Sequence, residues 1–236
     1  MTSVLSGQRM RWNRWRAASG VRFGTLRRLS PISSVFGFDR GLPIDRHFIE
    51  RFLAEHSSDI QGRVLEVADN AYTCKFGGGR VVVADVLHAI PGNPQATIIG
   101  DLSSGDGLPS EAFDCILLTQ TLQMIYDLRG AARHVCRMLK PGGVLLATVP
   151  GISQISRYDM DRWGDYWRFT SLSVRRLFEE AGAMEVRVET YGNVLAAVAF
   201  LHGLAAEELR EDELSYLDPD YELLIAVRAV KTRSEE

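Results

Sequence analysis

The sequence has no apolar run of about 18 residues, the length that a membrane-spanning helix needs. No apolar segment typical of a secretory signal stands at its N-terminus, so we expect a cytoplasmic protein without a membrane span. Cysteine is scarce, and Cys74, Cys115 and Cys136 are too scattered for a disulfide framework. Cys115 and Cys136 read as buried free thiols. No cluster of Cys, His, Asp and Glu has metal-ligand spacing, so we predict no metal site, with a magnesium site on scattered acids as the open alternative.

Glycine is missing at the turn where a nucleotide-binding unit normally carries it. Residues 63–67 form an apolar strand that contains Glu66, and a second apolar strand, 80–84, leads into Asp85, 19 positions after Glu66. An acid after the second strand of such a unit binds ribose hydroxyls. The turn, however, carries Ala68, Asn70 and Tyr72 where Gly-x-Gly-x-Gly would let the backbone approach a ligand. The spacing therefore predicts a cofactor, and the turn predicts an altered wall around it.

The 236 residues suit one α/β domain with an appendage. A net charge of −3 gives no general reason to expect nucleic-acid binding. Charge is nevertheless uneven, because residues 1–40 contain eight arginines and one acid, whereas 207–222 is strongly acidic. Residues 1–42 form a basic arm of a kind that can contact a membrane surface, nucleic acid or another protein, although we expect no nucleic-acid partner. The other interpretation is a partly disordered leader, or an arm that pairs with the acidic segment of its own or a neighbouring subunit in a homo-oligomer.

Apolar β-branched runs alternate with helical patterns, which predicts a doubly wound, mainly parallel sheet. The expected strands are 63–67, 80–84, 96–99, 113–118, 144–149, 185–191 and 222–230. The expected helices are 45–55, a short one near 71–76, 129–139, one capped by Ser171 or Ser173 and ending at 181, and an apolar one over 193–209. Residues 151–170 form an aromatic loop with no helix or strand signal, and loops of this length tend to be functional.

Four motifs in order resemble class I S-adenosylmethionine-dependent methyltransferases, in particular their small-molecule and sugar-modifying subgroup. They are Val64-Leu-Glu-Val67, Asp85, Gly100-Asp-Leu102, and the run from Asp114 to Leu139-Lys-Pro-Gly-Gly143. The resemblance covers about residues 43–231 and excludes the basic arm. It implies a seven-stranded sheet whose last strand is antiparallel and lies between the fifth and sixth. Segment 192–221 is longer than the family's usual connection, so we treat it as an inserted helical segment of a domain spanning 43–236.

The resemblance also implies the residues of the cofactor site. Asp85 would accept hydrogen bonds from the ribose, Asp101 from the adenine amino group, and Glu66 would orient the methionine ammonium. The complete set expected around S-adenosylmethionine is Glu66, Ala68, Asp69, Asn70, Asp85, Val86, Asp101, Leu102, Thr119 and Gln120. Gln123 stands where many relatives have histidine. Tyr72 is the replacement that is hardest to accommodate, unless its ring points away from the cofactor or covers it.

Aromatic and charged side chains of the 151–170 loop suit the binding of a hydroxylated ring. The expected substrate-binding residues are Tyr158, Trp163, Tyr166, Trp167 and Arg168; a self-packed lid is the other interpretation. His47, His88 and His202 are weak candidates for a catalytic base. We therefore expect O-methylation of a small molecule such as a sugar or secondary metabolite. The alternatives are a methyltransferase-like scaffold that has lost catalysis and, less favoured, a nicotinamide-dependent oxidoreductase, which lacks its Gly-x-Gly-x-x-Gly here.

Overall fold

The computed structural model describes residues 24–232, which fall into two units, 24–32 and 33–232. The first unit contains one helical turn, Gly24–Leu26. Most of the basic arm therefore lies outside the described residues, and the predictions for it stay predictions. The compact domain begins at Ser33, earlier than the boundary at residue 43 that the sequence suggested.

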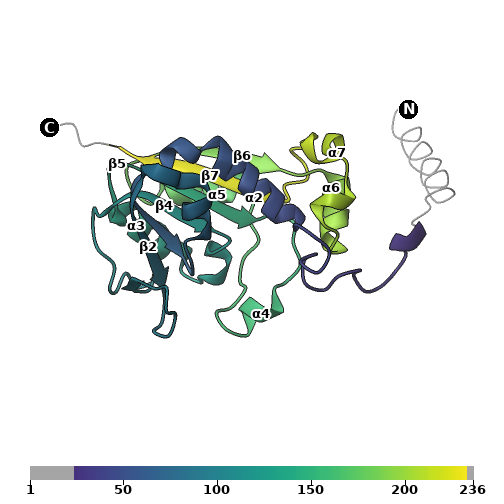
Figure 1. The fold of residues 1–236 in the computed structure, drawn as a ribbon, viewed down its shortest axis with the longest axis horizontal. Helices are drawn as coiled ribbons and strands as arrows, with labels where there is room; N and C mark the ends of the chain where they lie inside the picture. The colour runs from purple at the N-terminus through teal and green to yellow at the C-terminus, as the bar shows by residue number, and fades with distance from the viewer. Residues whose placement is uncertain (1–23, 233–236) are drawn as a thin grey trace, which may run out of the picture. The chain divides into compact units, whose positions relative to one another are not determined.

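The domain is built on a seven-stranded sheet with the order β3-β2-β1-β4-β5-β7-β6 (Figure 1). The strands are β1 (Gly62–Val67), β2 (Val81–His88), β3 (Ile98–Ile99), β4 (Phe113–Thr119), β5 (Leu139–Pro150), β6 (Met184–Tyr191) and β7 (Leu224–Lys231). The β1–β2, β1–β4, β2–β3 and β4–β5 pairs are parallel, whereas β7 is antiparallel to both β5 and β6. This arrangement confirms the predicted fold, including the insertion of the last strand.

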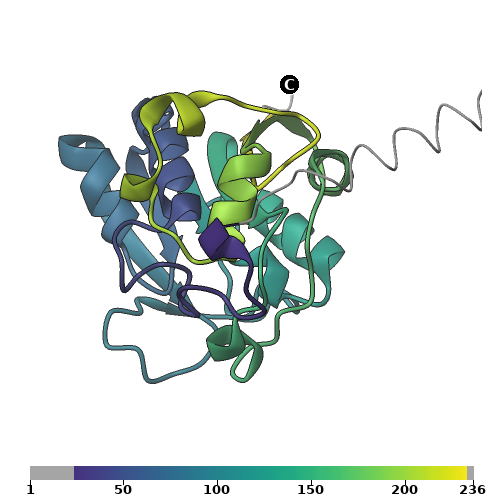
Figure 2. The ribbon, with the colours of Figure 1, turned by 90° about the vertical axis from the view of Figure 1, so that its right-hand side faces the viewer.

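Successive side chains of the central strands point to opposite faces of the sheet, and both sets are apolar. Helices therefore cover each face. On one face, α3 (Leu128–Met138) and α5 (Ser171–Glu179) pack on Leu65, Leu87 and Phe113. On the other, α2 (Ile44–Glu55) and α6 (Val194–Leu201) pack on Val64 and Leu117. Figure 2 shows the ribbon from a second side. α2 places Ile44, Phe48, Ile49, Phe52 and Leu53 on one buried face. This burial holds its first turn at the end of the sheet where the parallel strands finish.

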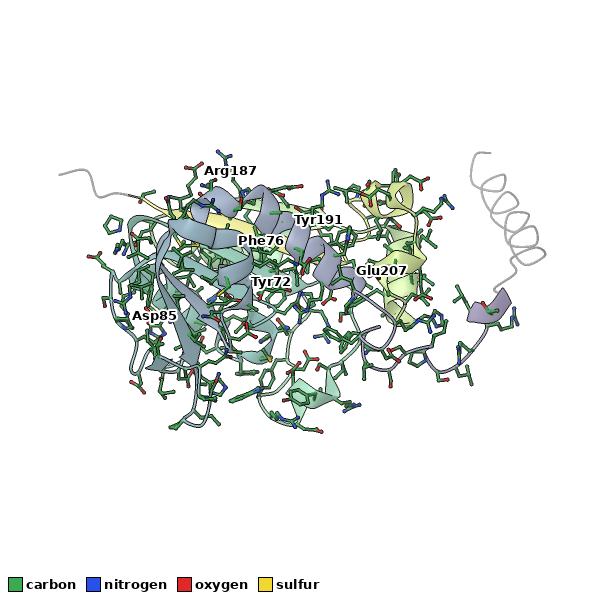
Figure 3. All side chains as sticks on the ribbon, in the orientation of Figure 1. Tyr72, Phe76, Asp85, Arg187, Tyr191 and Glu207 are labelled. Carbon is green, nitrogen blue, oxygen red and sulfur yellow. The ribbon has the colours of Figure 1, made fainter. Side chains whose placement is uncertain are left out.

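The segment before α2 is fixed to the segment after α6. The Ser33 amide donates to the His202 carbonyl at 3.1 Å, and Arg40 forms an ion pair with Glu208. The Glu207 carboxylate, labelled in Figure 3, accepts the Leu42 amide at 3.0 Å. Part of the acidic segment therefore pairs with arginine and amide groups of its own chain. The predicted inserted segment 192–221 thus supports the N-terminal edge of the domain.

Several predicted boundaries need correction. The helix expected over 193–209 stops at Leu201, because Gly203 takes a φ of +70° and its Cα lies too close to Ser33 for a side chain. A short helix, α7 (Glu211–Ser215), follows. The 151–170 loop is not free of regular structure, since α4 (Arg157–Met160) lies within it. α5 is capped by Thr170, one residue before the predicted Ser171 or Ser173.

Candidate active site

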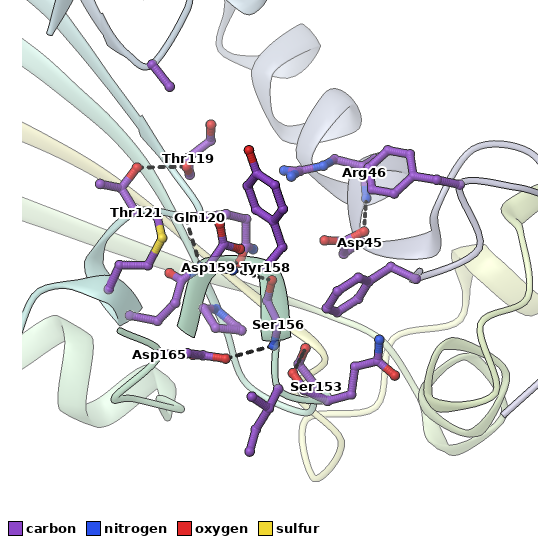
Figure 4. Close-up of a pocket in the computed structure, with 18 of the residues that line it drawn as sticks. Asp45, Arg46, Thr119, Gln120, Thr121, Ser153, Ser156, Tyr158, Asp159 and Asp165 are labelled. Carbon is purple, nitrogen blue, oxygen red and sulfur yellow. Dashed lines mark hydrogen bonds between the residues drawn. The ribbon is translucent and has the colours of Figure 1, made fainter. Parts of the chain in front are cut away.

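A cavity of about 790 Å³ opens where β1, β4 and β5 end (Figure 4). Carboxyl ends of parallel strands, at a point where the strand order reverses, form the usual ligand site of open α/β sheets. Five segments line it: 34–38, the first turn of α2, 66–72 at the end of β1, 119–124 at the end of β4, and 150–168 at the end of β5. Of the residues predicted from sequence, it brings together Glu66, Ala68, Asp69, Thr119, Gln120, Tyr158 and Arg168.

The turn after β1 keeps a glycine-like path without glycine. Ala68 has a φ of +73°, the left-handed region that normally favours glycine. Its side chain is exposed, so the methyl group displaces no neighbour. Glu66 is buried and accepts three hydrogen bonds, from the Thr73 amide and hydroxyl at 2.8 Å each and from the Tyr72 amide at 3.2 Å. Burial raises the pKa of Glu66, and these donors oppose the rise. Glu66 thus fixes the path of the turn through its hydrogen bonds to Tyr72 and Thr73.

Tyr72 lies beside the cavity without filling it. Its ring packs on Phe76 at 6.1 Å between centroids and against the core beneath α2 (Figure 3). Burial is the main cause that raises the pKa of Tyr72, while a hydrogen bond with Arg46 acts in the opposite direction. The ring therefore forms a wall between α2 and the turn. This placement answers the steric question that the sequence raised about the third missing glycine.

Asp85 and Val86 lie inside β2 and outside the lining of the cavity. The Asp85 carboxylate accepts from Arg63 Nε and from Thr97 Oγ1, at 2.7 Å each. Asp85 shares the face of the sheet occupied by Leu87, which packs under α3 and α5. His88 ends the strand, its Nδ1 lies 2.7 Å from the Ile90 carbonyl, and Trp163 packs edge-on against its ring. The strand end therefore presents histidine instead of an acid.

Asp101 and Leu102 also lie outside the cavity lining. The Asp101 carboxylate accepts the amide and hydroxyl of Ser103, both at 2.7 Å, as in a local turn. Leu102 is buried in the core under α3. Asn70 is likewise outside the lining, although its neighbours Asp69 and Ala71 belong to it.

The turn after β4 contains a buried acceptor without a partner. Gln120 has a φ of +46°, which turns the chain at the end of the strand. Gln123 lines the cavity at 9% exposure, and its amide nitrogen donates to the Gln120 carbonyl at 2.8 Å. Among the described side chains, its Oε1 is one of the buried atoms with no hydrogen-bond partner. An unpartnered acceptor on a cavity-lining residue is a candidate partner for a donor group of a ligand.

The aromatic segment is partly self-packed, as one of the two sequence interpretations expected. Trp167 donates to the Ile125 carbonyl at 3.0 Å and stacks on Tyr126, which also meets Tyr166 edge-on. Arg168 bonds Asp165 and the carbonyls of Ser153, Gln154 and Trp167. Tyr158 lines the cavity, with the Arg162 guanidinium 3.5 Å from its ring centroid. Within the described chain, Tyr158 and Arg168 are the cavity-lining members of the predicted substrate set, and Arg168 has a structural partner for each of its nitrogens.

None of the three candidate histidines, His47, His88 and His202, reaches the cavity lining. His47 packs edge-on against Phe48, and His202 ends α6 with a buried Nδ1 that has no partner in the described residues. Neither has the access to the cavity that a catalytic base requires.

Asp45 and Arg46, in the first turn of α2, are cavity residues that the sequence analysis missed (Figure 4). Asp45 Oδ1 accepts the Arg46 amide at 2.8 Å, and among the described residues no ion pair within 4 Å involves its carboxylate. Burial raises the pKa of Asp45, with Arg46 as the main opposing influence. An acid in a first helical turn ordinarily complements the helix dipole. Only the position of α2 in the fold reveals that Asp45 also lines the cavity.

In the described part of the chain, residues 24–232, no group of three or more His, Cys, Asp and Glu is arranged to hold a metal ion. Over the same range, no helix combines the length and apolarity needed to cross a membrane.

The comparisons with known proteins identify the family. The methyltransferase-domain family matches residues 37–192, about two thirds of the chain, and the protein belongs to it. It is a class I S-adenosylmethionine-dependent methyltransferase. No curated protein sequence matches the chain.

Solved structures agree with this assignment at the level of the fold. A S-adenosylmethionine-dependent methyltransferase from Archaeoglobus fulgidus is 11% identical, with a TM-score of 0.52 over 79% of this chain and 94% of that one. A second from Mesorhizobium loti is 15% identical, with a TM-score of 0.53 over 79% and 97%. Phosphoethanolamine N-methyltransferase 2 from Haemonchus contortus, in complex with S-adenosylmethionine, is 14% identical, with a TM-score of 0.51 over 85% of this chain and 61% of that one.

Proposed function

We propose that the protein transfers the methyl group of S-adenosylmethionine to a hydroxyl of a small molecule, such as a sugar or a secondary metabolite. The size of the cavity supports a small acceptor, since about 790 Å³ lies within the usual range for small-molecule sites. Aromatic and hydrogen-bonding side chains share the lining, which suits a ring that carries hydroxyls. Phe36, Phe38, Tyr72, Tyr158, Ser156 and Asp159 belong to this lining.

The residues on the β1 side of the cavity fit the amino-acid end of the cofactor. Ala68 takes the left-handed turn that brings the backbone close to a ligand, and Asp69 adds a carboxylate beside it. The unpartnered Gln123 Oε1 supplies an acceptor on the β4 side. We therefore propose that Glu66, Ala68, Asp69, Thr119 and Gln120 hold this end, Glu66 acting through the turn it organises. When bound, S-adenosylmethionine supplies an electrophilic methyl group on a sulfonium.

Asp45 is the observation that carries the choice of a hydroxyl acceptor. A hydroxyl is a weak nucleophile, and a base beside it helps as its proton is lost. The Asp45 carboxylate would accept the hydroxyl proton as the acceptor oxygen takes the methyl group. A burial-raised pKa brings this carboxylate nearer to the working pH, where a general base is most effective. Tyr158 and the aromatic segment would hold the acceptor and exclude water.

The test is a transfer assay with methyl-labelled S-adenosylmethionine and a panel of free sugars, glycosides, phenols and primary amines. We expect labelled products from hydroxyl acceptors, with NMR assigning the new methyl group to oxygen. Label transferred to amines alone would contradict the proposal.

A further inference from the structure

We propose that His88, and not Asp85, holds the ribose of the cofactor. This inference concerns the family's cofactor and is independent of the acceptor. It depends on three features of β2: the register of the strand, the partners of the Asp85 carboxylate, and the hydrogen bond that fixes the His88 ring.

The register places His88 at the end of the sheet and Asp85 well inside it. Asp85 pairs with Leu65, and Leu87 pairs with Val67, the last residue of β1. The Ala68 amide donates to the Leu87 carbonyl at 3.0 Å, so His88 lies level with the turn after β1. On the other side, His88 pairs with Ile99, the last residue of β3. Asp85 is therefore three residues, about 10 Å along the strand, before the carboxyl end of the sheet, where ribose binds in folds of this type.

The Asp85 carboxylate is already bonded on both oxygens. Oδ2 accepts from Arg63 Nε and Oδ1 from Thr97 Oγ1, at 2.7 Å each, and the side chain is 8% exposed. The Arg63 guanidinium also lies 5.1 Å from the centroid of the Phe113 ring, on the face of the sheet under α3. Asp45 and Tyr72, in contrast, reach the cavity from the α2 side. The geometry gives Asp85 a role in joining β1, β2 and the start of β3.

The His88 ring has one acceptor available at the strand end. Its Nδ1 lies 2.7 Å from the Ile90 carbonyl, which can only accept, so Nδ1 carries the proton. In the neutral ring, Nε2 is then an acceptor, and no bond to it is recorded among the described residues. Trp163 packs edge-on against the ring at 5.5 Å between centroids, which limits its rotation. An oriented Nε2 can accept a hydrogen bond from one ribose hydroxyl, whereas a carboxylate can accept hydrogen bonds from both.

Isothermal titration of the full chain with S-adenosylhomocysteine tests this inference without an acceptor. We expect His88→Ala to bind it about tenfold more weakly, the effect of one hydrogen bond lost from a partly buried pair. His88→Gln, whose amide oxygen reaches about as far as Nε2, should stay within about threefold of the wild type. Asp85→Asn should stay within about twofold and instead lower the melting temperature, because it removes the charge opposite Arg63.

Analogues of S-adenosylhomocysteine without the 2′ or the 3′ hydroxyl show whether the lost contact is to ribose. We expect the wild type and His88→Ala to bind one of these two analogues equally, since its missing hydroxyl is the donor. Thr97→Val, which removes one partner of Asp85 and leaves the carboxylate in place, serves as a second variant should Asp85→Asn fail to fold. It too should keep the wild-type affinity. A tenfold loss in Asp85→Asn with none in His88→Ala would overturn the inference, as would an equal loss for both analogues in His88→Ala.

Discussion

Ala68 offers the sharpest test of how the turn after β1 works without glycine. Its φ of +73° costs an L-residue about 1–2 kcal/mol relative to glycine. Ala68→Gly removes that strain but adds about 0.4–1 kcal/mol of backbone freedom to the unfolded chain. Because the side chain is exposed, little packing is lost. We expect a net stabilisation of about 0.5–1 kcal/mol, or about 1–4 °C in melting temperature for a chain of this size.

Urea unfolding followed by circular dichroism measures this difference without any ligand. Ala71→Gly is the matched control, since Ala71 is exposed, lies in the same turn, and is absent from the residues with positive φ in the described chain. It should destabilise the protein by about 0.5–1 kcal/mol, the ordinary cost of glycine. Ala68→Val should cost about 1–3 kcal/mol, because a β-branched residue tolerates this region poorly. A destabilised Ala68→Gly variant would refute the strain argument.

Two further predictions concern acids that the structure places in particular surroundings. The hydrogen bond from Arg40 lowers the pKa of Glu208 to about 2 from 4.5, so the pair stabilises the fold fully above about pH 4.5 and is lost as the pH falls through 2. With about a third of each side chain exposed, Glu208→Gln should cost about 1 kcal/mol at pH 7, and the cost should shrink as the pH falls toward 2 in urea unfolding; a constant difference would contradict this. Asp45→Asn should lower kcat by about 10²–10⁴ with unchanged S-adenosylhomocysteine affinity, whereas Glu50→Gln, on the same helix but paired with Lys75 outside the cavity, should keep kcat. Equal effects of these two substitutions would remove Asp45 from the proposed chemistry.

The sequence predicted the fold well because each strand and helix leaves a local pattern. The order of motifs from Val64 to Gly143 also sufficed for the antiparallel last strand, which the pairing of β7 with both β5 and β6 confirms. Strand ends were harder. Asp85 looked like the end of β2 because it interrupts an apolar run, yet Val86 and Leu87 continue the strand. A polar residue inside a strand needs a partner from elsewhere, and Arg63 and Thr97 are partners that no local pattern reveals.

The site itself was only partly predictable, because it is assembled from segments that are distant in sequence. Strand ends are visible in a sequence, and five predicted residues lie at or just after the ends of β1 and β4: Glu66, Ala68, Asp69, Thr119 and Gln120. Asp45 and Arg46 enter the cavity only because the buried face of α2 fixes where its first turn lies. The orientation of Tyr72 likewise depends on Arg46 and Phe76. Packing between elements, and not local pattern, decides such placements.

The contacts of Arg168 have a consequence for the cost of binding. One guanidinium bonds Ser153 and Gln154 at the start of the aromatic segment, and Asp165 and Trp167 near its end. These hydrogen bonds hold the two ends of the segment together without a covalent link. The conformational entropy of this segment is lost when the protein folds. Binding of an acceptor therefore does not carry that free-energy cost. Arg168 therefore favours tight binding of a small acceptor without having to contact it.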